Sequence, residues 1–257
     1  MTAKWLQLGA ALAGMALLAA CTGMAQQQEG GPADAEFVHG PAAATVKGDK
    51  AKDPTSAADY YRSLYSSDPT NLAAAIGMLQ NLREMGSFDQ ARETASKLLA
   101  GKPDEPKLVA EFGKIELASG RFKEAVQLLE RAVTLDGSDW TAHSALGIAY
   151  DRLGDYDRAE KSYKAALAVS PDNPVVLSNL ALSKAMGGDL KAAKALLQQA
   201  SMSNHADARV RQNYALVSAL GGDLARAEAL AKQDLPPDLA QDTIAYYREL
   251  AAGATVK

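Results

Sequence analysis

The chain has 257 residues, which allows one or two domains at about 100–200 residues per domain. Alanine occurs 52 times and aromatic residues make up only 6% of the chain, a composition that favours close-packed helices over a β-sandwich or barrel. The formal net charge of −4 argues against a nucleic-acid partner, which would require a basic surface. The single cysteine excludes an intramolecular disulfide and a cysteine-rich metal site.

Residues 1–20 have the pattern of a secretory signal peptide. Lys4 supplies a short positive segment, and residues 5–18 are almost entirely apolar. The sequence Leu-Ala-Ala-Cys then ends at Cys21 and resembles the bacterial lipobox, in which the signal is cleaved before a lipidated cysteine. The resemblance implies that Cys21 is the lipidation site. The alternative is an ordinary signal peptide with an incidental cysteine.

Thr22 bears on the membrane that would hold this lipid anchor. In bacterial sorting signals that this one resembles, aspartate after the cysteine retains a lipoprotein at the inner membrane. Threonine therefore implies the outer membrane, and two or more acyl chains make such anchoring stable. We expect a protein that is lipid-anchored in the bacterial outer membrane and faces the periplasm.

Residues 21–53 contain this cysteine and then a segment rich in Gln, Gly and Pro. Such a composition buries too little apolar surface to fold, so the segment is predicted to be a flexible tether. Its r.m.s. reach is roughly 30 Å, and its fully extended length is roughly 110 Å. A short helix or strand near Phe37 and Val38 is the alternative.

The remaining chain repeats with a period of 34 residues. Glycine recurs at Gly86, Gly120, Gly154, Gly188 and Gly222. Alanine recurs at Ala91, Ala125, Ala159, Ala193 and Ala227. An aromatic residue or leucine recurs at Phe88, Phe122, Tyr156, Leu190 and Leu224. Three kinds of position that stay in phase over five units predict a repeated helical hairpin.

The period and the residue types resemble the tetratricopeptide repeat (TPR), a helix–turn–helix unit. The best match is Leu146-Gly147, Tyr150, Ala159 and Tyr163 in one unit. The resemblance predicts an all-α TPR α-solenoid, a right-handed superhelix of such hairpins, over residues 54–252. Its parts are a half-repeat 54–71, the repeats 72–105, 106–139, 140–173, 174–207 and 208–234, and a C-terminal capping helix 238–252.

Each recurring residue type has a physical role in this prediction. A small residue in the first helix of a repeat, helix A, lets the second helix, helix B, pack closely. The turn glycine supplies the left-handed conformation that ends helix A. Asp155, Asp189 and Asp223 follow the turn glycine and are predicted N-caps of helix B.

No motif for catalysis or cofactor binding occurs in the sequence. Phosphate-binding loops, nucleophile elbows and zinc-helix motifs are all missing, so we expect no enzyme, no cofactor and no metal ion. His39, His143 and His205 lie far apart, and His143 is predicted to be a core or semi-buried residue. Pairs of acidic and basic residues along the helices are expected to be solvated.

In TPR arrays helix A lines a concave face, so the resemblance implies a partner groove there. The expected groove residues are Ile148, Arg152, Asn179, Leu182, Met186, Asn213, Leu216 and Leu220. Their apolar members are predicted to face out of the helix packing as one strip, which marks a partner site. The two asparagines are expected to bind a peptide backbone, because an amide both donates and accepts. The alternatives are a strip buried by tight curvature and solvated asparagines.

The order of lipobox, tether, TPR array and final helix resembles the TadD-type lipoprotein of the tight-adherence (Flp) pilus system. The resemblance implies a non-enzymatic scaffold that helps an outer-membrane secretin to assemble or localise. Its partners would be proteins of that pilus or secretion complex, and its lipid would bind the membrane. The alternative is an adaptor that recruits peptidoglycan hydrolases or other envelope proteins.

Overall fold

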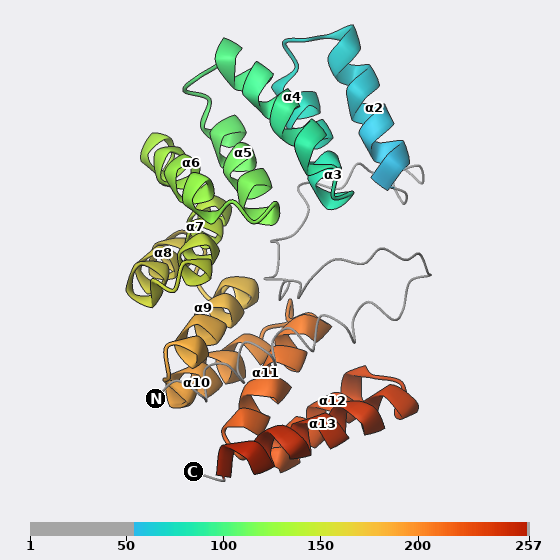
Figure 1. The fold of residues 1–257 in the computed structure, drawn as a ribbon, viewed down its shortest axis with the longest axis vertical. Helices are drawn as coiled ribbons and strands as arrows, with labels where there is room; N and C mark the ends of the chain where they lie inside the picture. The colour runs from blue at the N-terminus through green and yellow to red at the C-terminus, as the bar shows by residue number, and fades with distance from the viewer. Residues whose placement is uncertain (1–53, 256–257) are drawn as a thin grey trace. The chain divides into compact units, whose positions relative to one another are not determined.

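The computed structural model describes residues 54–255, which form twelve helices and no strand (Figure 1). The predicted all-α solenoid is confirmed. The predicted signal peptide 1–20, Cys21 and the tether lie outside the described residues. Within residues 54–255, every helix is too short or too polar to cross a membrane.

The described residues divide into two compact units, 54–171 and 172–255, called the first and second unit below. The first unit contains α2 (Pro54–Ser67), α3 (Leu72–Glu84), α4 (Phe88–Gly101), α5 (Pro106–Ala118), α6 (Phe122–Leu135), α7 (Trp140–Arg152) and α8 (Tyr156–Val169). The second contains α9 (Pro174–Met186), α10 (Leu190–Ser201), α11 (Ala208–Leu220), α12 (Leu224–Asp234) and α13 (Pro237–Thr255). The A helices are α3, α5, α7, α9 and α11, and each begins at the first residue of a predicted repeat.

The turns between helices A and B are those that the sequence predicts. The five turn glycines have φ angles between 71° and 101°, a conformation that glycine adopts without steric cost. The side chains of Asp155, Asp189 and Asp223 each accept a hydrogen bond from a backbone N–H in the first turn of helix B. The predicted N-caps are therefore confirmed.

The hairpins are held together by close packing of helix B on helix A. The five alanines that recur in helix B are fully buried. In the second repeat, a Cβ atom at Gly113 would lie only 2.7 Å from Cγ of Leu129. A larger residue at either kind of position would push the two helices apart.

The first repeat departs from this pattern. Leu79, which is fully buried, occupies the position where the other repeats have glycine or alanine. The glycine of α3 is Gly77, which faces α2, and a Cβ atom there would lie 2.6 Å from the ring of Tyr61. Accordingly, α3 packs more extensively against α2 than against α4.

The last helix, α13, closes the second unit. Its buried residues Ile244 and Tyr247 join a hydrophobic cluster with residues of α11 and α12. Its opposite side carries the exposed residues Asp242, Arg248 and Glu249. The terminal helix of a solenoid has one side that no repeat covers, and polar residues on that side keep it soluble.

Candidate protein-binding face

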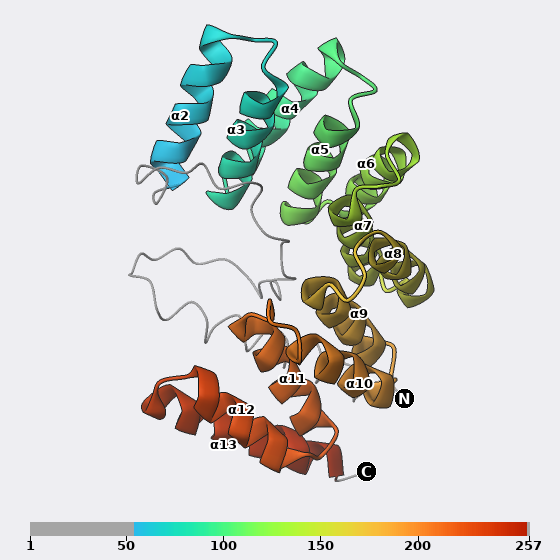
Figure 2. The same cartoon turned by 180° about the vertical axis from the view of Figure 1, so that it is seen from behind.

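The candidate site is the A-helix face of each unit, formed by the A helices that contact one another there. Within the first unit α3 contacts α5 and α5 contacts α7, and within the second unit α9 contacts α11 (Figure 2). Ile148 and Arg152 belong to the first unit, whereas the other six predicted groove residues belong to the second. Because these are separate compact units, a single strip that joins Ile148 to Leu182 stays a prediction.

Two of the predicted groove leucines are core residues. Leu182 exposes 6% of its surface and Leu216 exposes none. Leu182 belongs to a hydrophobic cluster with residues of α10 and α11, including Val217. Leu216 belongs to a cluster with residues of α12 and α13, including Ile244. The expectation that both leucines face out of the helix packing is wrong, because the following helices cover this side of helix A.

The two asparagines do not form a free amide ladder. The Nδ2 group of Asn213 donates a hydrogen bond to Oγ of Ser178 at 3.0 Å, which links α11 to α9. Asn179 is fully buried, so the alternative of a solvated residue is also wrong for this position. The Asn213 amide would have to exchange its internal hydrogen bond to hold a peptide, which reduces the net gain.

The other four predicted groove residues differ in their exposure. Met186 and Leu220 are half-buried and pack against the cluster of Leu182, so each keeps an accessible edge. Ile148 exposes 5% of its surface, so the expectation that it faces out of the helix packing is wrong as well. Arg152 is half-buried, and its guanidinium lies 4.6 Å from the centre of the Phe122 ring, within the range of a cation–π interaction.

Polar side chains join neighbouring A helices of the first unit. Nε of Arg83 on α3 donates to Oε1 of Glu111 on α5 at 2.8 Å, and these side chains are 9% and 2% exposed. Nζ of Lys114 donates to Oγ1 of Thr141 on α7 at 2.7 Å. The expectation of solvated ion pairs is therefore wrong for Glu111, since the stacked helices cover it.

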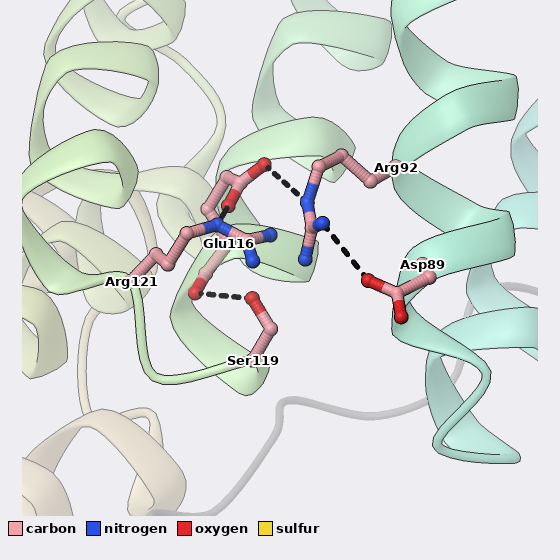
Figure 3. A network of polar contacts seen from close by, with 5 residues as sticks. All are labelled: Asp89, Arg92, Glu116, Ser119 and Arg121. Carbon is pink, nitrogen blue, oxygen red and sulfur yellow. Dashed lines mark hydrogen bonds and ion pairs between the residues drawn. The ribbon is translucent and has the colours of Figure 1, made fainter.

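A second buried carboxylate, that of Glu116, lies between two arginines (Figure 3). Arg121 donates to one of its oxygens, and Nε of Arg92 on α4 lies 3.4 Å from the other. Arg92 also donates to Oδ1 of Asp89 at 2.9 Å. This network joins α4 to α5 and to the turn before α6. The sequence analysis did not predict this network. The available signal was that Glu116 stands one repeat before Tyr150, so a charged residue occupies a position where the best-matching repeat has an aromatic one.

Two histidines lie within the described residues. His143 is half-buried as predicted, and its Nε2 lies 3.1 Å from the carbonyl oxygen of Gly137. His205 is exposed in the loop after α10. Between residues 54 and 255, no three His, Cys, Asp or Glu side chains are grouped so that they could hold a metal ion.

Each unit is thus a stack of helical hairpins whose A helices lie side by side. The chain belongs to the tetratricopeptide repeat family. One model of that family matches residues 50–110 and 152–220, and a second matches residues 111–174. The matches run through the first four predicted repeats and into the fifth.

Curated relatives share the repeats over a small part of their own length. The CTR9 homolog of Arabidopsis thaliana is 27% identical over 135 residues, which are 52% of this chain and 12% of that protein. An O-mannosyl-transferase of Caenorhabditis elegans is 33% identical over 99 residues, which are 38% of this chain and 14% of that protein. The chain therefore spans about an eighth of the length of these relatives.

Solved structures with the same fold include a type IV pilus biogenesis factor. PilW, a widely conserved type IV pilus biogenesis factor, is 22% identical with a TM-score of 0.63, over 79% of this chain and 91% of PilW. PilF of Pseudomonas aeruginosa is 18% identical with a TM-score of 0.59, over 75% of this chain and 90% of PilF. A TPR protein of Thermus thermophilus is 23% identical with a TM-score of 0.59, over 64% and 90% of the two chains. At these identities the likeness shows the fold.

Proposed function

We propose that this protein is a lipid-anchored scaffold of the bacterial outer membrane, facing the periplasm, that helps a tight-adherence (Flp) pilus secretin to assemble or localise. The TPR fold supports the scaffold role, since stacked repeats present an extended surface to protein partners. The observation that carries the finer role is the Leu-Ala-Ala-Cys sequence ending at Cys21, followed by a polar tether and then the repeats.

The pilus assignment draws on a likeness of fold. PilW, whose structure covers 79% of this chain, is a type IV pilus biogenesis factor. Fold-level analogy does not define a function by itself, because one fold serves many functions. The proposal therefore also draws on the order of lipobox, tether and repeats along this chain, which resembles the TadD-type lipoprotein of the tight-adherence pilus system.

The partner contact in this proposal uses the accessible edges of the A helices in the second unit. Met186 and Leu220 would contact an extended or helical apolar segment of the partner. Leu182 and Leu216 would form the rigid core beneath them, since both are buried. Asn213 would hold the partner only by exchanging its hydrogen bond to Ser178.

The lipid anchor is tested by two substitutions at the lipobox. Cys21→Ser should leave the signal uncleaved and remove the protein from the outer-membrane fraction. Thr22→Asp should keep the lipid but move the protein to the inner membrane, which makes it a control for lipidation without outer-membrane sorting. Normal outer-membrane fractionation of the Cys21→Ser variant would contradict the proposal.

The partner is tested by photo-crosslinking in living cells. A photoreactive amino acid at position 186 or 220 should crosslink to secretin subunits. The same amino acid at Gln198, which is exposed on helix B, should not. Capture of peptidoglycan hydrolases at positions 186 and 220 would instead support the adaptor function and contradict a secretin role.

A further inference from the structure

The first unit contains a cavity of about 390 Å³. Helices α2, α3, α4 and α5 all contribute to its lining, and none of the lining residues stands at a predicted groove position. Its lining includes the apolar or aromatic side chains of Tyr65, Leu72, Leu98 and Leu108 and the basic side chains of Lys97 and Lys102. Its volume lies in the range of about 300–1,000 Å³ that is usual for ligand pockets.

The first repeat, which provides most of this lining, departs from the other repeats in sequence. Leu79 fills the position where a glycine or alanine lets helix B approach helix A in the other repeats. Consequently α4 contacts α3 less extensively than α6 contacts α5. The open space lies between the later part of α4, which contributes Thr94 and Leu98, and the start of α3, which contributes Leu72 and Ala75.

The lining combines apolar walls with positive charge. Leu72, Leu98 and Tyr65 are half-buried, so their side chains remain partly open to the cavity. Two lysines, Lys97 and Lys102, complete the lining, and none of its described residues is acidic.

The two lysines remain available to an incoming carboxylate. Lys97 pairs with Glu93 at 2.6 Å, but both side chains are largely exposed, and such pairs are weak. Nζ of Lys102 donates a long hydrogen bond, of 3.4 Å, to the carbonyl oxygen of Thr70. The carboxylate of Asp68 also attracts this ammonium group, but Asp68 is exposed to water. A carboxylate beside the cavity can therefore compete for both ammonium groups.

We propose that this cavity is a second docking site, which takes one or two apolar side chains from a partner peptide that has acidic residues next to them. The apolar side chains fill the space between α3 and α4, and the carboxylates contact Lys97 and Lys102. The charge of the lining favours an acidic segment over a basic or neutral one. The site does not depend on the function proposed for the A-helix face, because the two share no residue.

A fluorescence binding experiment tests this site in the full-length protein, held in nanodiscs of phosphatidylethanolamine. The probe is a labelled dodecapeptide with a central Leu-Phe pair flanked on each side by two aspartates. Two control peptides carry lysines in place of the aspartates or alanines in place of the Leu-Phe pair. The acidic apolar peptide should bind at least about tenfold more tightly than either control.

A matched pair of variants locates the binding. Gly101 ends α4 and lines the cavity, and a Cβ atom there would meet no atom within 4 Å. Gly101→Phe should therefore block the cavity without disturbing the fold and weaken binding by about tenfold. Ala100→Phe adds the same side chain at an exposed neighbour outside the lining and should leave binding unchanged.

Charge reversal and lipid binding complete the test. Lys102→Glu should weaken binding of the acidic peptide by about tenfold, with circular dichroism as the control for folding. Equal binding of the lysine peptide, or full binding by the Gly101→Phe variant, would overturn the proposal. Binding of phosphatidylglycerol vesicles by wild type but not by Gly101→Phe would assign the cavity to a lipid and overturn the proposal as well.

Discussion

The ring of Tyr163 lies directly against the backbone of Gly147, so that a Cβ atom at residue 147 would come within 2.6 Å of Cε1 of the ring. Tyr163 is fully buried, and its hydroxyl donates a hydrogen bond to Oδ2 of Asp151 at 2.7 Å. Burial, together with the charge of Asp151, raises the pKa of Tyr163 well above its ordinary value. The phenol therefore stays a hydrogen-bond donor, and this contact sets the spacing of α7 and α8.

Gly147→Ala is expected to destabilise the first unit. The added methyl group would overlap the Tyr163 ring, and overpacking of this kind costs about 1–3 kcal/mol. Urea unfolding measures the change. The control is Gly101→Ala, where the methyl group meets open space and the better helix propensity of alanine should leave stability equal or raise it by up to about 1 kcal/mol. A Gly147→Ala variant as stable as this control would contradict the packing.

Leu216→Asp is expected to unfold the second unit in part or completely. The substitution places a carboxylate in the cluster that joins α11, α12 and α13, at a cost of at least about 3 kcal/mol. Far-UV circular dichroism during urea unfolding measures the loss. Leu220→Asp, at a half-buried position, should cost less than half as much. If Leu216→Asp left the stability unchanged, Leu216 would not be buried and would be an accessible groove residue.

Glu116→Gln is expected to lower the free energy of unfolding by about 1–3 kcal/mol. The carboxylate is 4% exposed and lies between Arg92 and Arg121, so its neutral replacement leaves two guanidinium groups close together without a counter-charge between them. Glu124→Gln, at an exposed position in the next helix, serves as the control and should change stability little. Equal urea midpoints for the two variants would show that the network contributes no stability.

The aspartate N-caps predict a loss of stability in acid. A hydrogen bond from the backbone N–H of Arg158 lowers the pKa of Asp155, and a hydrogen bond from Lys194 lowers that of Asp223, both from an ordinary value of 3.8. Because the native pKa values are depressed, this stability is present above pH 3.8 and is lost as the pH falls through them.

Asparagine at both positions isolates this effect. It keeps a capping oxygen but cannot titrate, so the double variant Asp155→Asn, Asp223→Asn should lose less stability than wild type on acidification. Urea midpoints measured from about pH 5 downward provide the comparison. Parallel acid curves for the two proteins would contradict a contribution from these caps.

The sequence by itself determined the repeated helical hairpin. The turn at Gly154 and the cap at Asp155 depend on backbone conformation and hydrogen bonds within a few residues, and the buried Ala159 depends on its phase along one helix. Interactions this local recur wherever the same residues recur at the same spacing. The 34-residue period was therefore enough to place the turns, the caps and the helix pairs.

Only the tertiary structure decided which residues of helix A are covered. The sequence shows that Leu182 lies on an apolar side of its helix. It does not show that Val217, a whole repeat further along the chain, packs in the same cluster. Glu111 likewise meets Arg83 from the preceding repeat, and the cavity of the first unit is lined by residues of four different helices. Burial depends on the distance and direction of neighbouring helices, which the side chains of several repeats set together.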